Sequence, residues 1–456
     1  MMKKQCAVTM TDGPIWKRII SFAIPIFFGN VFQQLYNTVD SLIVGNFIGK
    51  DALAAVSSSG SLIFLMVGFF NGIAMGAGVS ISRYYGAKQY DDMQESIHTD
   101  IAFGLCAAII LTIIGVTFTP HILELIGVPE SVMPNSIAYF RTYFSGVITI
   151  IMYNIAVGIL QAVGDSRHPL YYLIISSFTN VILDLLFVAI FKWGVASAAL
   201  ATVISQGLSA VLCYARLIRH DTVYRVSLKK IRFYPGKFQE VLSLGIPSGL
   251  QNSVISIANV VVQSRINMFD VSAVAGCGAY SKVEGFAFLP ITCFSMALTT
   301  FVGQNLGAKQ YDRAKKGAAF GIICSMLMAE VVGVCIYTFS PYLIALFNDD
   351  PEVIAYGVRQ AHTEALFYCF LAFSHCIAGI MRGAGRAKVP MFTMLACWCL
   401  LRITYITIAV KIIPDISVIF WAYPLTWFVS SVVFLIYFVK VDWVHGFEQN
   451  KFISHN

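Results

Sequence analysis

The sequence predicts an all-α membrane protein with twelve transmembrane helices. The chain of 456 residues is 57% hydrophobic and 12% charged, roughly half the charged fraction of an average soluble domain. Its apolar runs are as long as "AFGLCAAIILTIIGVTFTP" (102–120), and about 20 apolar residues suffice for a helix to cross the hydrocarbon layer. The alternating pattern of a membrane β-barrel does not occur in these runs.

Hydropathy places one span in each of twelve segments. We expect them at 15–45, 52–82, 94–118, 132–161, 168–191, 195–218, 238–266, 272–303, 314–338, 354–381, 389–412 and 416–440. The polar start "MMKKQCAVTMTDGPIWKRII" leads straight into the first span and does not resemble a cleaved signal peptide.

The distribution of basic residues supports this number of spans. With both termini in the cytoplasm, 23 of the 31 Lys and Arg residues fall in inner segments, and only Lys50, Lys192 and Lys411 fall in outer loops. This is the positive-inside pattern of a multi-pass inner (plasma) membrane protein. It accounts for the +7 net charge without a nucleic-acid partner.

The chain repeats itself after about 221 residues. "YYGAKQYDD" (84–92) returns as "NLGAKQYDR" (305–313), and "GILQAVGDSRHP" (158–169) returns as "GIMRGAGRAKVP" (379–390). We therefore expect two lobes of six helices, 1–219 and 238–456, joined by a basic cytoplasmic linker at 220–237. Parallel repeats of this kind are typical of secondary transporters, with the substrate site between the halves; a duplicated channel or structural bundle is the alternative.

Polar side chains form a stripe on the first span. Gln33, Tyr36, Asn37 and Asp40 share one face of a helix, with Gln34 beside them. A charged residue at membrane depth costs about 2.5–3.5 kcal/mol on insertion scales. Asp40 is therefore a candidate functional residue, and Gln33, Gln34 and Asn37, with Gln206 of the sixth span, are candidates for a substrate cavity.

A second acid lies in the fifth span. Asn180 and Asp184 are four residues apart and share a helix face, as do Thr202 and Gln206 in the sixth span. Tyr139 and Asn154 are further polar candidates in the fourth. Two carboxylates in a dry bundle can hold a proton, or bind Na⁺ with the oxygens of Asn180 and Thr202; a neutral packing motif is the alternative.

The second half differs at the equivalent positions. Leu401 and Tyr405 stand where the first half has Asn180 and Asp184, so we expect the paired acids in the first half alone. Candidates for a central substrate cavity in the second half are Gln251, Glu284 and His375. The sequence does not decide whether Glu330, Glu364 or His375 takes part.

Two further features bear on mechanism. Pro25 removes a backbone hydrogen bond in the first span, which favours a kink that cation binding at Asp40 could change; a static kink is the alternative. The sequence has no phosphate-binding loop of the GxxxxGK[ST] type. We expect a transporter driven by an ion gradient, without catalytic residues or cofactors.

These segments resemble the multidrug and toxic-compound extrusion (MATE) family. The resemblance rests on "IPIFFGNVFQQLYNTVDSLIVGNFIGKDALAAVS" (24–57), the two "GAKQYD" motifs, "GILQAVGDSRHP" and "GIMRGAGRAKVP". It implies a V-shaped pair of six-helix bundles. Asp40, Asn180, Asp184 and Thr202 look like the cation site of the DinF-like branch, and Tyr36, Tyr139, Asn154 and Pro25 match positions that accompany it. The glutamate and aspartate of the NorM-like branch are matched by Gln251 and Leu371.

The resemblance implies a monomeric antiporter that exports lipophilic organic cations in exchange for H⁺ or Na⁺, with membrane lipid around it. Two other functions remain open from the sequence. One is a flippase for lipids or lipid-linked oligosaccharides of the same superfamily, and the other is a membrane receptor or scaffold that transports nothing.

Overall fold

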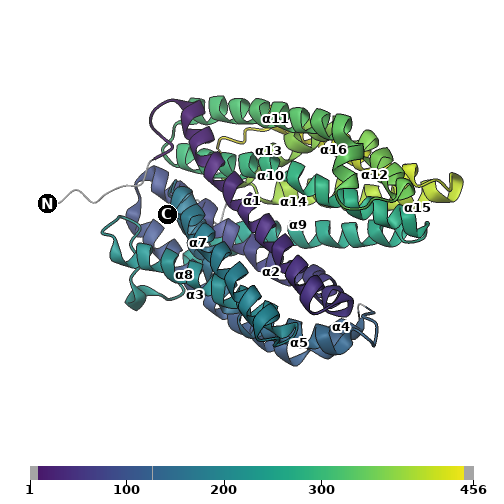
Figure 1. Ribbon diagram of the computed structural model, residues 1–456. Helices are drawn as coiled ribbons and strands as arrows, with labels where there is room; N and C mark the ends of the chain where they lie inside the picture. The colour runs from purple at the N-terminus through teal and green to yellow at the C-terminus, as the bar shows by residue number, and fades with distance from the viewer. Residues whose placement is uncertain (1–8, 126, 446–456) are drawn as a thin grey trace. The chain divides into compact units, whose positions relative to one another are not determined.

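The computed structural model describes residues 9–125 and 127–445, and within these ranges it consists of helices and their connections (Figure 1). This confirms the all-α fold class. Ten helices are long and apolar enough to cross a membrane, and a bent pair makes an eleventh span. One more helix, α2, has 38 residues and is also long enough to span, which gives the twelve spans that the sequence predicts.

The first half contains eight α-helices. Their bounds are α1 Ile15–Phe47, α2 Lys50–Ala87, α3 Tyr90–Thr117, α4 Thr119–Leu125, α5 Met133–Ser145, α6 Val147–Ala162, α7 Arg167–Asp184 and α8 Ala196–Arg219. A π-helical segment, η1 Leu185–Ile190, continues α7. α5 and α6 form one span with a bend of 49° at Gly146.

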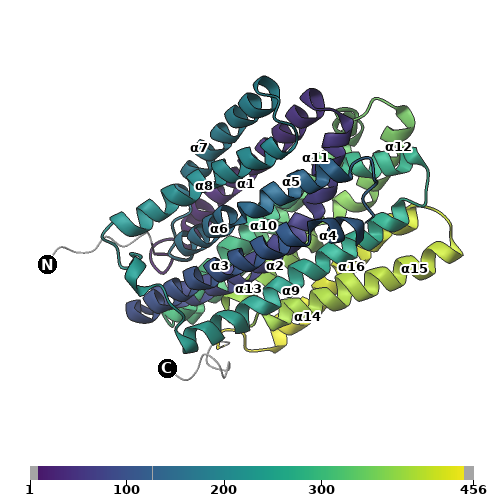
Figure 2. The same cartoon turned by 90° about the horizontal axis from the view of Figure 1, so that it is seen from below.

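The second half repeats this order. Its helices are α9 Pro235–Ile266, α10 Val271–Gly307, α11 Tyr311–Ala345, α12 Pro351–Glu364, α13 Tyr368–Gly383, α14 Lys388–Met394, α15 Arg402–Ile412 and α16 Ser417–Lys440. The 3₁₀ segment η3 Ala365–Phe367 joins α12 to α13, and the π segment η4 Leu395–Leu401 joins α14 to α15. Figure 2 shows α14 and α15 following one another along α16.

The repeated motifs adopt the same local conformation in both halves. Lys88 and Lys309 lie just after α2 and α10 with φ values of 59° and 56°, in the left-handed region that residues other than glycine seldom occupy. Gly164 and Gly385 have φ values of 89° and 77° in the second repeated motif. The sequence repeat is therefore also a repeat of the turns that set the helix ends.

The chain packs as two compact units whose limits fall inside two helices. Among the described residues, one unit comprises Thr9 with Ile24–Gly249, and the other comprises Met10–Ala23 with residues 250–445. The sequence places the lobe limits in the linker, whereas α1 and α9 each contribute one part to each unit. Hydropathy does not detect such limits, because both helices stay apolar and helical across them.

In the Ile24–Gly249 unit, α1 lies beside α7, where Gly29 faces Leu170 and Leu173 (Figures 1 and 2). The apolar core of this unit lies mainly among α2, α3, α5, α6 and α8. Large apolar side chains such as Ile113 and Ile182 are more than half exposed. Such exposed apolar surface is expected where helices face lipid.

The first part of α9 packs tightly on α2. A Cβ atom added to Gly76 would lie 2.3 Å from the backbone nitrogen of Gly245, and one added to Gly72 would lie 2.4 Å from the Cα of Gly249. Glycines four residues apart on both helices permit this approach, as in close helix pairs within membranes.

A buried polar cluster holds the start of α9 to α2 and α3. Glu240 accepts hydrogen bonds from Ser80 (2.8 Å) and Tyr84 (2.7 Å). Lys237 donates to the Tyr84 hydroxyl (2.9 Å) and pairs with Asp92 (2.7 Å). We call these five residues the α9 polar cluster; they fix the entry of α9 into its unit.

Candidate functional site

The structure brings the two acids of the first half together. Asp40 on α1 is 7% exposed, and Asp184 at the end of α7 is fully buried. Their carboxyl groups lie close enough to interact electrostatically with each other.

The surroundings of this pair leave several polar atoms unpaired. Among the described residues, no hydrogen-bond partner exists for Oδ1 of Asp40, for either oxygen of Asp184, or for either amide atom of Asn180. Asn180 lies one turn before Asp184 and is 1% exposed. Buried polar atoms normally find partners, which makes this group a candidate binding site.

Two tyrosines and a glutamine surround the acids. Gln206 on α8 donates a hydrogen bond to the hydroxyl of Tyr36 at 3.0 Å, while its own carbonyl oxygen lacks a partner within the described chain. Tyr36 and Tyr139 are both buried and interact electrostatically with the two aspartates. The site therefore draws on α1, α5, α7 and α8.

Two predicted members have hydroxyl or amide groups engaged with their own helix. Thr202 is partly buried and donates to the carbonyl of Ala198 at 3.2 Å. Asn154 donates to the carbonyl of Ile150 at 2.9 Å. In both residues the side-chain oxygen remains available as an acceptor. Their roles as ligands stay predictions.

The backbone changes immediately after Asp184, where the π-helical segment η1 begins. Single π turns inside α-helices occur often at functional sites. The extra residue per turn shifts the register of the side chains that follow Asp184, and sequence periodicity does not reveal this change.

The remaining polar residues of α1 lie at the edge of this group. Gln33 and Asn37 are exposed, and Gln34 is partly buried. Their assignment to a substrate cavity stays a prediction. α1 remains helical through Pro25, and its packing passes from one unit to the other between Ala23 and Ile24.

The expectation of paired acids in the first half alone is wrong. Glu364 on α12 is fully buried and interacts electrostatically with Glu284 on α10. Gln360 donates to Glu364 at 2.9 Å, and the buried guanidinium of Arg402 acts electrostatically on both acids. Glu284 and Glu364 lie 80 residues apart and on different helices, so spacing within one helix could not reveal them.

Arg402 is held by its own set of contacts. It donates to Thr426 at 2.8 Å and lies over the rings of Tyr423 (4.5 Å) and Trp398 (5.6 Å). Unlike the Asp40–Asp184 pair, the acids of the second half thus have a permanent cation nearby.

The other second-half candidates do not join Glu284. Gln251 is buried and donates to the sulfur of Met394. The ring of His375 is partly buried and lies against Phe288 and Trp398, an environment typical of a packed histidine.

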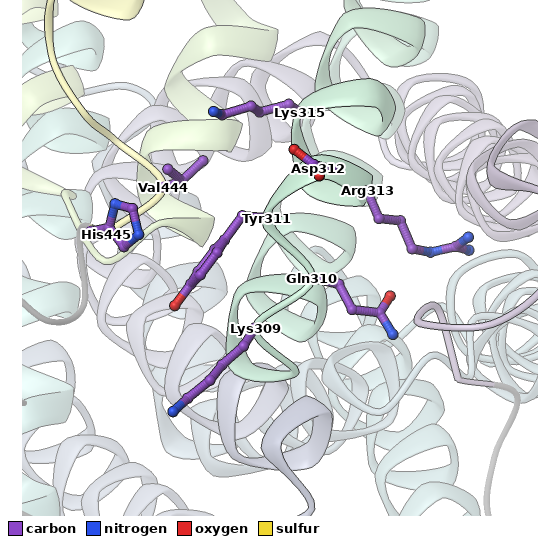
Figure 3. A pocket seen from close by; sticks show the side chains of 8 residues that line it. All are labelled: Lys309, Gln310, Tyr311, Asp312, Arg313, Lys315, Val444 and His445. Atoms are coloured by element: carbon purple, nitrogen blue, oxygen red, sulfur yellow. The ribbon is translucent and has the colours of Figure 1, made fainter.

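A surface cavity of about 520 Å³ lies at the start of α11. Figure 3 shows Tyr311 and Lys309 on the side of His445, with Arg313 turned away. The hydrogen bond from His445 holds the pKa of Asp442 below its usual range. Arg313 is already engaged, since it donates to the backbone carbonyls of Met10 and Asp12.

Among the described residues, no group of three or more His, Cys, Asp or Glu side chains is arranged to hold a metal ion. Any cation at Asp40 and Asp184 would therefore depend on amide and hydroxyl oxygens for its other ligands. Carboxylate, amide and hydroxyl oxygens suit a hard cation or a proton.

Two homologous halves of membrane-spanning helices, with buried ionisable groups inside them, define a polytopic transporter rather than an enzyme. The family model named MatE matches residues 25–186 and again 247–408, so the two copies are displaced by 222 residues. The chain belongs to the MatE family of membrane transporters.

Relatives and solved structures agree with this assignment. The chain is 29% identical to "Probable multidrug resistance protein YpnP" of Bacillus subtilis, over 86% of this chain and 88% of that protein. It is 26% identical to "Probable multidrug resistance protein NorM" of Thermotoga maritima, over 84% and 83% of the two chains. The outward-facing structure of a multidrug resistance MATE family transporter aligns with a TM-score of 0.90 at 20% identity, over 95% and 97% of the two chains.

Proposed function

We propose that the protein exports lipophilic organic cations from the cytoplasm and that entry of H⁺ or Na⁺ drives this export. The observation that carries the proposal is the buried Asp40–Asp184 pair, in which Oδ1 of Asp40 and both oxygens of Asp184 lack hydrogen-bond partners among the described residues. The names of the relatives in Bacillus subtilis and Thermotoga maritima support multidrug efflux as the activity. An inner-membrane location, cytoplasmic termini and a monomeric state are part of the same proposal.

The physical basis of coupling is the cost of charge inside the membrane. Two ionised carboxylates at close range repel each other, and burial removes the water that would stabilise them. A proton or Na⁺ taken up from outside neutralises the pair. Asn180 would donate to the ionised form, and its carbonyl oxygen would be one ligand for Na⁺. The bound and free states of the pair thus favour different arrangements of the surrounding helices, which is the requirement for exchange transport.

The test compares neutral variants of the two acids in a host that lacks its own efflux pumps. Asp40→Asn and Asp184→Asn should each reduce ethidium efflux by at least about tenfold, because an amide removes the titrating charge with little change of shape. Immunoblots of the membrane fraction should show unchanged amounts of protein. Asp312→Asn is the matched control, because Asp312 is exposed at the start of α11; it should export normally.

Wild-type efflux from cells with Asp40→Asn would exclude Asp40 from coupling. Collapsing the proton gradient and the sodium gradient in turn identifies the driving ion. If neither collapse changes efflux, ion coupling itself is excluded. Lipid translocation without drug efflux would favour a flippase.

A further inference from the structure

A second surface cavity, of about 440 Å³, lies between α3 and the linker that follows α8. Its walls carry opposite charges. Asp91 and Glu95 stand on the first two turns of α3, and Lys229, Lys230 and Arg232 stand on the linker. None of these five residues forms an ion pair within the described part of the chain. The cavity therefore offers unpaired charges of both signs to a ligand.

The linker is held rigidly on α3. Nε2 of His98 accepts a hydrogen bond from the backbone N–H of Ser227 at 3.0 Å. Gln94 donates to the carbonyl of Val223 at 2.6 Å. The N–H of Tyr234 donates to the hydroxyl of Thr99 at 3.3 Å. These three bonds lie before and after the three basic residues of the linker in the sequence. They hold the basic wall of the cavity in place without a ligand.

Apolar side chains stand beside this charged cavity. Leu228 is 67% exposed and Phe233 is 42% exposed, and both flank the three basic residues in the sequence. The linker joins two membrane spans, so it lies at the membrane surface. Exposed apolar and basic side chains at that level are the composition of a segment that enters the lipid interface.

We propose that this cavity binds the headgroup of a phospholipid that carries both a phosphate and a primary ammonium, as phosphatidylethanolamine does. Lys229, Lys230 and Arg232 would receive the phosphate, and Asp91 and Glu95 would accept hydrogen bonds from the ammonium. Leu228 and Phe233 would contact the acyl chains. A trimethylammonium group cannot donate hydrogen bonds to carboxylates, so the acidic wall selects phosphatidylethanolamine over phosphatidylcholine.

The repeat supplies an internal comparison. The cavity of Figure 3 occupies the equivalent place in the second half, at the start of α11. It has a single acid, Asp312, and one of its three basic residues, Arg313, is bound to backbone carbonyls. The cavity at α3 thus differs in having an acid pair and three basic residues that form no ion pair within the described chain. Of these, Arg232 lies over the ring of Tyr234, 4.7 Å from its centroid.

The experiment measures lipid retention, which does not depend on transport. Protein purified in detergent receives equal amounts of phosphatidylethanolamine, phosphatidylcholine and phosphatidylglycerol with identical acyl chains, and native mass spectrometry counts the bound lipids. The wild type should retain phosphatidylethanolamine over phosphatidylcholine by about tenfold, the equivalent of one charge-assisted hydrogen bond.

Variants separate the two walls of the cavity. Lys229→Gln, Lys230→Gln and Arg232→Gln combined should abolish retention of phosphatidylethanolamine. Asp91→Asn with Glu95→Gln should remove its advantage over phosphatidylcholine. The matched control replaces three exposed lysines elsewhere, Lys17, Lys316 and Lys388, with Gln and should behave as the wild type.

Three results would overturn the proposal. They are equal loss of lipid in the control and the linker variant, retention of phosphatidylglycerol in preference to phosphatidylethanolamine, and displacement of the lipid by millimolar soluble phosphoethanolamine. The last result would mean that the cavity recognises the headgroup as a free solute. Because the readout is lipid binding, failure of drug efflux would leave this inference intact.

Discussion

At the scale of single residues, the buried acids of the two halves have different surroundings. Among the described residues, no cationic side chain acts on Asp40 or Asp184, whereas Arg402 acts electrostatically on both Glu284 and Glu364. A buried acid with a fixed cation resembles a structural ion cluster, whereas a buried acid at membrane depth without one is a candidate functional site.

This difference leads to a prediction for Arg402. Arg402→Gln should lower the unfolding free energy by about 3 kcal/mol, because it removes the buried cation that interacts with Glu284 and Glu364. Adding Glu364→Gln should restore part of the loss. The measurement is the unfolding temperature of each purified variant in detergent. A double variant no more stable than Arg402→Gln would show that Arg402 acts through its contacts with Thr426 and Tyr423 instead.

The residues of the first-half acid group could be predicted because helix spacing and polarity agree. Asp40 belongs to a stripe on one helix face, and Asn180 lies one turn from Asp184 on another. The interaction of Glu284, Glu364 and Arg402 was not predicted, because these residues lie on different helical segments. The sequence repeat pointed instead to Leu401 and Tyr405. Contacts between distant helices leave no periodic signal within either helix.

At the scale of helices, α2 and the first part of α9 pack with their backbones in direct contact. Glycines at 72, 76, 245 and 249 have no side chains, so the backbones of the two helices can touch directly. Such contact maximises dispersion attraction where water cannot drive helices together. The helix pair is therefore sensitive to a single methyl group.

We predict that Gly76→Ala destabilises the protein, since its Cβ would lie 2.3 Å from the nitrogen of Gly245. Overpacking of this kind costs about 1–3 kcal/mol, which should appear as a lower unfolding temperature in detergent. Gly78→Ala on the same helix is the control, because its nearest neighbour would lie 3.9 Å away. An equal unfolding temperature for both variants would contradict the proposed close contact.

The helix positions themselves follow well from hydropathy. The first span was expected at 15–45 and runs from Ile15 to Phe47; the last was expected at 416–440 and runs from Ser417 to Lys440. The bend at Gly146 and the π segments after Asp184 and before Arg402 were not foreseen. They depend on local packing, as where Gly146 meets the side chain of Val203, and hydropathy averages over such detail.

At the scale of the whole molecule, the duplication explains the order of helices. Both halves use the same turns, and the left-handed residues Lys88 and Lys309 end the second helix of each half. The repeat therefore made the number and order of spans predictable. It did not allow us to predict that α1 and α9 each divide between the two packing units. The sequence of a continuous apolar helix does not show where its packing partners change.

Because α1 and α9 each contribute to both packing units, cutting the chain between the halves should have a specific effect. A cut between Val226 and Ser227 would leave residues 235–249 on the second fragment, although they complete the unit that the first fragment mostly builds. Residues 10–23 would likewise remain on the first fragment. Each polypeptide alone should be degraded or aggregate, and both expressed together should co-purify as one particle on size exclusion.

A stable, monodisperse first fragment on its own would refute this expectation. The two halves of this chain descend from a duplication, yet each contributes a short stretch of helix to the unit that the other mostly builds. Dividing the chain at the boundary of the repeat would therefore remove part of both packing units.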